Sequence, residues 1–264
     1  MTSDAYAVLT SRGLPHPKTF TLDEMLQRSS PDSRFFVRYK EPTALPSFIT
    51  PREASAYAGD LRELIADGKI QEIEEGIRSS NGGCVVQTPQ FLYVEIVAGH
   101  LSGLLRRGWC QLRHYASPTK TATVRVAQFQ MVEQCQRANR TVRSQELANT
   151  SIDSILESVK GHMLRQAGAL LYEFIVDAQD TVFFVDYKQY EWSIDFSRLF
   201  HTSTENSPYL LGRNDSHVKE YDGDFELQNL DRIDRESVIR IGNRAALSHF
   251  ITYALQKGVC CITR

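Results

Sequence analysis

The stretch Leu170-Leu171-Tyr172-Glu173-Phe174-Ile175-Val176-Asp177-Ala178-Gln179-Asp180-Thr181-Val182-Phe183-Phe184-Val185-Asp186-Tyr187-Lys188 decides the fold that we expect for this chain. Its two ends, residues 170–176 and 181–187, are rich in aliphatic and aromatic residues, which favour β-strands. The run Asp177-Ala178-Gln179-Asp180 between them is short and polar, as turns are. The pattern therefore predicts two antiparallel strands joined as a hairpin.

Two acids and one lysine lie on this hairpin. In antiparallel strands with a short turn, Glu173 and Asp186 can lie near each other on one face, and Lys188 points the same way. Two neighbouring carboxylates raise each other's pKa unless a cation lies between them. Mg²⁺ bound with ATP phosphates meets this need, and Lys188 would contact the phosphoryl group that moves. The alternative is a solvent-facing pair of acids, offset by Lys188 in a weak surface salt bridge.

A second informative stretch runs from Leu247 to Thr263. Ser248 precedes an apolar helical pattern, so we expect it to cap the helix, whose partially positive N-terminus suits a phosphate. His249 is then a candidate nucleophile that receives a phosphoryl group. The alternative is a capped helix with an ordinary, partly buried histidine.

The rest of the chain alternates strand-like and helix-like segments. Helix starts are expected at Thr21 and Thr50, from their capping residues and acids. Asn81-Gly82-Gly83 is interpreted as a turn, and residues 202–230 as a linker or irregular region. The remaining predicted elements are strands at 34–40, 84–89, 91–97, 109–115 and 122–130, a short helix near Gly103, a helix at 151–166, and strand, turn, helix and strand within 231–264.

Two of these strands carry a charge among apolar residues. Arg38 either pairs with Glu41 or another acid, or contacts a phosphate. Glu95 needs a partner, because a buried carboxylate is costly when unpaired, and a ribose hydroxyl, a lysine or a metal would serve. Glycines follow Glu95, so nucleotide is the partner that we expect. Gly99 and Gln87 are further nucleotide-binding candidates.

These segments resemble the nucleotide-binding half of phosphoenolpyruvate synthase and pyruvate phosphate dikinase, which has an ATP-grasp fold. The similar segments are Arg34-Phe35-Phe36-Val37-Arg38, Glu95-Ile96-Val97-Ala98-Gly99-His100 with Leu104-Leu105-Arg106-Arg107-Gly108, and the hairpin. The stretch from Leu247 is similar to the phosphohistidine segment of the swivelling domain in the same enzymes. The similarity is patchy and covers roughly residues 30 to 264.

The resemblance implies a role for each candidate residue. Arg38 would contact a nucleotide phosphate, and Glu95 would lie at the ribose and phosphates. Glu173 and Asp186 would bind Mg²⁺, with Lys188 as the basic residue beside them. In the same comparison, His249 would be the phosphoryl carrier.

The chain also departs from this family. Asn243-Arg244-Ala245-Ala246 replaces the glycine pair that normally precedes the phosphohistidine helix, and Tyr39-Lys40-Glu41-Pro42 replaces the pattern expected after Arg38. The phosphoenolpyruvate and pyruvate barrel is absent. We therefore expect that this chain alone does not convert pyruvate, and that a partner protein supplies the missing domains if the full reaction occurs.

Composition indicates an ordinary soluble, globular protein of one large or two modest domains. The chain has 264 residues, 42% of them hydrophobic and 23% charged, and a formal net charge of −2. This charge gives no global attraction to nucleic acid or to an anionic membrane. Five scattered cysteines lack metal-site spacing, and no apolar run is long enough to cross a bilayer, so we expect a cytoplasmic protein with reduced thiols.

The sequence thus predicts an α/β (α+β) protein with an ATP-grasp-like unit at residues 1–200 and a small swivelling-type unit at 201–264. Its expected function is ATP- and Mg²⁺-dependent phosphoryl transfer to His249 or to a small molecule. One alternative is an ATP-grasp ligase that activates a carboxylate for attack by an amine. The other is a degenerate relative that acts as a nucleotide-binding or interaction subunit without catalysis.

Overall fold

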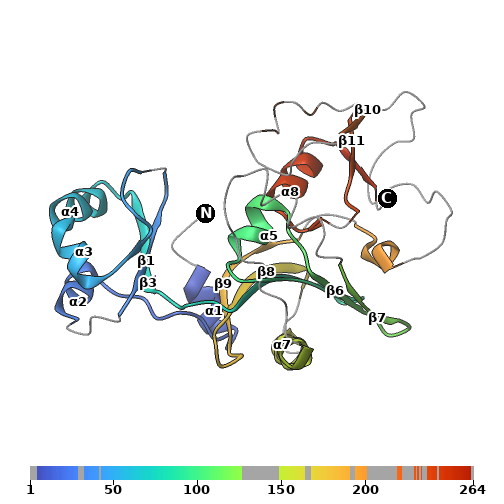
Figure 1. The fold of residues 1–264 in the computed structure, drawn as a ribbon, viewed down its shortest axis with the longest axis horizontal. Coiled ribbons are helices and arrows are strands. Elements are labelled where there is room, and N and C mark those ends of the chain that lie inside the picture. The colour runs from blue at the N-terminus through green and yellow to red at the C-terminus, as the bar shows by residue number, and fades with distance from the viewer. Residues whose placement is uncertain are drawn as a thin grey trace. The chain divides into compact units, whose positions relative to one another are not determined.

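The computed structural model of the chain (Figure 1) has the predicted mixed α/β class. The residues that it describes are 5–28, 33–41, 43–126, 149–163, 168–190, 194–200, 219–221, 229, 231, 233, 237–242 and 244–262.

The chain forms two compact units. Unit 1 comprises Met1–Arg78 and Phe183–Asp186, and unit 2 comprises Ser79–Val182 and Tyr187–Arg264. This division differs from the one predicted at residue 200, because the C-terminal helix packs against a helix of unit 2. Residues 201–218, in which the predicted linker begins, lie outside the described residues.

Unit 1 contains a three-stranded antiparallel sheet with the order β2-β1-β3. One face of this sheet forms a core with the helices, in which Phe35, Val37 and Ile73 pack with Met25 and Leu61. Because successive side chains of a strand point to opposite faces, the intervening polar residues of β1 and β3 lie on the other face. The elements are α1 (Ala5–Ser11), α2 (Leu22–Gln27), β1 (Phe35–Tyr39), β2 (Phe48–Ile49), α3 (Pro51–Ala56), α4 (Ala58–Ala66) and β3 (Ile70–Glu75).

Both predicted helix starts of unit 1 are confirmed. The Thr21 hydroxyl accepts the N–H of Glu24, and the Glu24 carboxylate accepts the N–H of Thr21. Thr50 and Glu53 make the same reciprocal pair at the start of α3. Such pairs satisfy N–H groups that have no partner within the helix, so a short local motif is enough to fix where a helix begins.

Unit 2 is built on a six-stranded sheet with the order β7-β6-β5-β4-β8-β9. The strands β7, β6, β5, β4 and β8 are antiparallel to their neighbours, and β8 pairs with β4 although a long segment separates the two in sequence. The predicted strands at 170–176 and 181–187 correspond to β8 and β9. The elements are β4 (Asn81–Gln87), β5 (Leu92–Ala98), α5 (Ser102–Arg107), β6 (Leu112–Ala116), β7 (Thr121–Arg125), α7 (Asn149–Met163), β8 (Leu170–Val176) and β9 (Val182–Gln189), of which Phe183–Asp186 belong to unit 1.

Helices cover both faces of the sheet in unit 2 (Figure 1): α7 lies on one face, and α5 and α8 (His249–Gln256) lie on the other. The predicted apolar face of α7 is confirmed, since Ile155 and Val159 are completely buried. No helix in the described part of the chain has both the length and the apolar character that a membrane span requires.

The prediction that Asn81-Gly82-Gly83 forms a turn is wrong, because these residues belong to β4. A Cβ atom at Gly82 would lie 2.6 Å from Cα of Leu101, and one at Gly83 would lie 2.3 Å from the ring of Phe174. The two glycines are therefore explained by the close approach of neighbouring chain segments, not by a turn.

The end of the chain forms the predicted strand, turn, helix and strand. A parallel sheet has the order β10-β11-β12, and α8 connects β11 to β12. The helix packs against both α5 and β12, so the C-terminal segment is part of unit 2. The elements are the 3₁₀ helix η1 (Phe196–Phe200), β10 (Lys219–Tyr221), β11 (Ser237–Arg240), α8, and β12 (Cys260–Ile262).

Candidate functional site

A row of four side chains crosses the six-stranded sheet in register. Its members are Arg113 of β6, Glu95 of β5, Cys84 of β4 and Glu173 of β8, each opposite the next. Opposed residues of antiparallel strands point to the same face, so the row is continuous on one side of the sheet. All four residues are buried, and buried polar groups need partners. Those partners define the candidate site.

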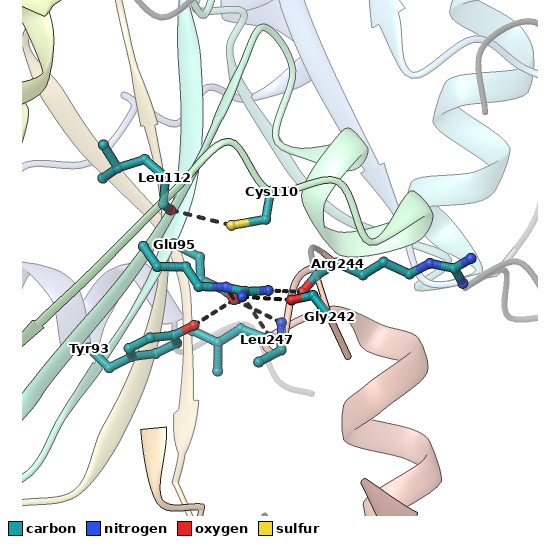
Figure 2. Close-up of polar contacts among 9 residues, drawn as sticks. Tyr93, Glu95, Cys110, Leu112, Gly242, Arg244 and Leu247 are labelled. Carbon is teal, nitrogen blue, oxygen red and sulfur yellow. Dashed lines mark hydrogen bonds and ion pairs between the residues drawn. The ribbon is translucent and has the colours of Figure 1, made fainter. Parts of the chain in front are cut away.

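The Glu95 carboxylate accepts hydrogen bonds from three directions (Figure 2). The Tyr93 hydroxyl donates to Oε1 at 2.7 Å, and the backbone N–H groups of Ala246 and Leu247 donate to Oε1 and Oε2 at 2.8 and 2.9 Å. Burial and the charge of Glu95 raise the pKa of Tyr93 well above its usual range, so Tyr93 stays a neutral donor. Glu95 thus has the partner that a buried carboxylate needs, and these contacts favour a structural role. Its role at a nucleotide stays a prediction.

Arg113 completes the arrangement around Glu95. Its Nε atom lies 3.4 Å from Oε1 of Glu95, Nη1 donates to the carbonyl of Gly242 at 2.8 Å, and Nη2 donates to the carbonyl of Arg244 (Figure 2). A planar guanidinium can bind several acceptors at once in a fixed geometry. The name anchor is used below for Glu95, Arg113 and the backbone groups that they bind, which belong to Gly242, Arg244, Ala246 and Leu247.

The anchor lies directly before α8. Ser248 is the N-cap of this helix, as predicted, and its hydroxyl accepts the N–H of Ile251 at 3.4 Å. Thr252 donates its hydroxyl to the carbonyl of Ser248 at 3.2 Å. His249 is therefore the first residue of a capped helix, with the helix start attached to the sheet.

Glu173, Lys188 and His249 come together from β8, β9 and α8. The Oε1 atom of Glu173 lies 3.4 Å from Nζ of Lys188 and 3.6 Å from Nε2 of His249. The Glu173 side chain is only 8% exposed, whereas those of Lys188 and His249 are 23% and 28% exposed. Glu173 is thus not the solvent-facing acid of the alternative hypothesis. It is a buried carboxylate with two basic groups at the edge of solvent.

The predicted magnesium pair is divided between the two units. Glu173 belongs to unit 2 and Asp186 to unit 1, so their joint binding of Mg²⁺ stays a prediction. The part of the chain that the structure describes has no group of three or more metal-binding side chains. Mg²⁺ on nucleotides usually takes only one or two carboxylates plus phosphate oxygens, so Glu173 beside Lys188 has suitable chemistry.

Arg38 lies in unit 1 with acidic neighbours. Its Nε donates to Oε1 of Glu74 at 2.9 Å, and Nη2 donates to the carbonyl of Val185 at 3.2 Å. The acid paired with Arg38 is therefore Glu74, not Glu41. Burial and the charge of Glu74 raise the pKa of Glu72 to about 7, although Arg38 opposes the shift. A phosphate contact by Arg38 stays a prediction.

Gln87 and Gly99 are not members of the row. Gln87 is the last residue of β4, opposite Leu92 and Leu170. Gly99 follows β5 in the left-handed region, at φ 83°, and its N–H donates to the carbonyl of Ser80 at 2.6 Å. A positive φ explains a glycine at this turn. The nucleotide-binding roles of both residues stay predictions.

The thiol of Cys84 is a poor nucleophile. Complete burial, followed by the charge of Glu173, raises its pKa well above the usual range. A thiol reacts through its thiolate, which this environment disfavours. Cys84 therefore fills the row between two carboxylates without supplying chemistry of its own.

Arg113 and Tyr93 were not among the predicted site residues. Tyr93 precedes Glu95 by two positions in a strand, and this spacing places both on one face. Arg113 lies in a segment that alternation predicted as a strand. Both signals indicate which face of the sheet these side chains occupy, but they do not reveal the backbone groups of Gly242, Arg244, Ala246 and Leu247 that bind Arg113 and Glu95.

The known proteins that resemble this chain do so at low sequence identity and low structural similarity. No protein-family model and no curated protein matches the sequence. Solved structures that resemble the chain include an N5-carboxyaminoimidazole ribonucleotide synthetase with ADP (9% identity, 73% of this chain and 45% of that protein, TM-score 0.39). An L-amino acid ligase from Bacillus licheniformis matches at 12% identity over 69% of this chain and 38% of that protein (TM-score 0.35).

A D-alanine-D-alanine ligase from Coxiella burnetii matches at 13% identity over 69% of this chain and 45% of that protein (TM-score 0.35). The chain spans less than half the length of each of these three proteins. TM-scores this low do not establish a shared fold or function.

Proposed function

We propose that the chain binds MgATP and transfers its terminal phosphoryl group to a small-molecule carboxylate, as ligases of the ATP-grasp kind do. The observation that carries this proposal is the buried Glu173 carboxylate beside Lys188 and His249. A carboxylate excluded from water and bordered by two basic groups is a site where charge can be bound and rearranged.

Each residue has a distinct part in the proposed reaction. Glu173 would bind Mg²⁺, and Lys188 would contact the phosphoryl group in transit. When bound, the metal supplies positive charge that neutralises the phosphates. Catalysis of phosphoryl transfer depends chiefly on such positioning and charge neutralisation, so few reactive side chains are needed.

The anchor supports a small-molecule acceptor. A phosphoryl carrier of the swivelling type has to move away from the nucleotide site to transfer its phosphoryl group. The segment before α8 is instead held by hydrogen bonds to Glu95 and Arg113. A phosphoryl group on Nε2 of His249 would also place new negative charge beside Glu173. We therefore assign His249 a contact with Glu173 and not the role of phosphoryl acceptor. Carboxylate-amine ligation is the reaction class to test first.

Transfer to His249 is the second candidate function. It is supported by Ser248 as N-cap, because a capped helix N-terminus with His249 as its first residue can stabilise a phosphate. The chain would then act as a phosphotransferase similar to the nucleotide half of phosphoenolpyruvate synthase, together with a partner protein.

One experiment distinguishes these functions. The chain is incubated with MgATP labelled at the β- or the γ-phosphate, with and without a panel of amino acids as carboxylates and amines. Ligation predicts ADP and phosphate release only with the panel and no label on protein. Transfer to His249 predicts an acid-labile label that His249→Ala abolishes, and this result would overturn the ligase proposal. No turnover and no ATP binding would indicate a non-catalytic subunit.

A further inference from the structure

We infer that Glu95 and Arg113 are positioning residues, which hold the start of α8 so that His249 stays beside Glu173. The inference deepens the proposed function, because it concerns how the same site is assembled. It assigns the buried pair a task other than contact with nucleotide.

The first step of the argument is the number of backbone groups that one ion pair satisfies. Glu95 accepts the N–H groups of Ala246 and Leu247, and Arg113 donates to the carbonyls of Gly242 and Arg244. Donors and acceptors of one short segment are thus bound by two side chains of the sheet. Loss of either side chain leaves buried backbone groups without partners.

The second step is the short distance along the chain between the anchor and the site. Leu247, bound by Glu95, is separated from His249 only by Ser248, which is completely buried and caps the helix. The intervening backbone has little freedom to absorb a displacement. A shift of Leu247 is therefore expected to move the His249 ring relative to Glu173.

The third step is that Glu95, which binds the segment before α8, and Glu173, which contacts His249, belong to the same row of the sheet. Glu95 and Glu173 both lie opposite Cys84, on either side of β4. The sheet thus fixes the spacing between the carboxylate that binds the helix start and the carboxylate that contacts His249. An anchor and a binding carboxylate on the two strands that flank β4 give the precise placement that catalysis requires.

The test uses the full chain with Glu95→Gln, which keeps the shape and removes the charge, and Arg113→Lys, which keeps the charge and removes the fork. The control is Val159→Ala, which removes buried apolar volume from α7 on the opposite face of the sheet. Hydrogen exchange is measured in peptides that span residues 244–250, and the ring nitrogens of His249 are followed by ¹⁵N NMR.

Both anchor variants should speed exchange of the Ala246 and Leu247 amides by about tenfold or more, and should change the Nε2 signal of His249. Val159→Ala should leave both unchanged. If His249 keeps its signal in the anchor variants, or if Val159→Ala changes it equally, the pair only stabilises the fold and the inference is overturned. Arg113→Lys keeps the test decisive if Glu95→Gln does not fold.

Turnover separates this inference from the proposed function. Where the wild type consumes ATP, the anchor variants should lower kcat while KM for ATP stays within about twofold, because they displace His249 without touching nucleotide. A rise in KM with kcat unchanged would contradict positioning. If the wild type neither binds nor consumes ATP, the proposed function fails, while exchange and the His249 signal still decide the inference.

Discussion

Each unit of the molecule contains an arginine paired with a buried glutamate, and the two pairs differ in what surrounds them. In unit 2, Arg113 and Glu95 are 4% and 0% exposed, and they bind backbone groups of Gly242, Arg244, Ala246 and Leu247. In unit 1, Arg38 is 23% exposed and contacts Glu74, with Glu72 as a further acidic neighbour.

The difference shows that an arginine and a glutamate on adjacent strands can have different roles. A pair sealed by backbone groups fixes a segment in place, since each group in it would be unpaired without the others. A pair with a surplus of acid responds to pH instead, because one carboxyl remains easy to protonate. The neighbouring segments, not the pair itself, decide which behaviour results.

The largest effect is expected from breaking the pair of unit 2. Arg113→Ala leaves Glu95 buried without its cation and frees two backbone carbonyls, so the free energy of unfolding should fall by about 3–5 kcal/mol. Urea denaturation followed by circular dichroism measures the change. A loss below about 1 kcal/mol, typical of an exposed pair, would refute the comparison.

A smaller effect is expected in unit 1. Arg38→Ala also removes a partner of a buried carboxylate, Glu74, but water reaches part of the arginine side chain. We expect a loss of about 1–3 kcal/mol in the free energy of unfolding, measured in the same way. A loss as large as that of Arg113→Ala would remove the distinction between the two pairs.

Acid should weaken the protein through His114 of unit 2. Burial, followed by the charge of Lys160, lowers its pKa to about 4, and its Nε2 is buried with no hydrogen-bond partner among the described residues. The folded state therefore favours the neutral ring, whereas the unfolded chain binds a proton below about pH 6.5. The free energy of unfolding therefore falls as pH falls from about 6.5 towards 4. His114→Gln should make the acid-side loss shallower in urea titrations across that range. An unchanged slope would show that His114 does not titrate in this way.

Glu72 of unit 1 should give the opposite pH dependence. Its pKa is raised to about 7, so the folded state holds a proton that the unfolded chain releases near pH 4.3. Stability from this group is complete below about pH 4.3 and is lost as pH rises through about 7. Glu72→Gln should flatten this loss in denaturant midpoints measured from about pH 5 to 8. A slope equal to that of the wild type would exclude Glu72 as its source.

Much of the fold could be predicted because its signals are local. The capping boxes at Thr21 and Thr50, and the apolar runs of β8 and β9, each depend on a few adjacent residues. The prediction of a turn at Gly82 and Gly83 was wrong, because glycine is needed there for the close approach of Leu101 and Phe174, which are distant in sequence. Packing between segments that are distant in sequence could not be predicted from local patterns.

The candidate site shows the same limit. That Glu95 needs a partner follows from its apolar strand, but the partner is backbone more than a hundred residues later, where side-chain identity gives no signal. Glu173 and Lys188 could be associated because one hairpin carries both. The contact of His249 with Glu173 depends on the anchor, and no spacing predicts it.

Nucleotide binding at Glu173 is the central claim, and thermal unfolding with and without MgATP tests it most directly. At a concentration of about one hundred times its Kd, the ligand should stabilise the wild type by about 2.7 kcal/mol. Glu173→Gln should lose most of this stabilisation, while Glu157→Gln, an exposed glutamate on α7 that pairs with Lys160, should keep it. No stabilisation of the wild type, or equal stabilisation of Glu173→Gln, would contradict the account.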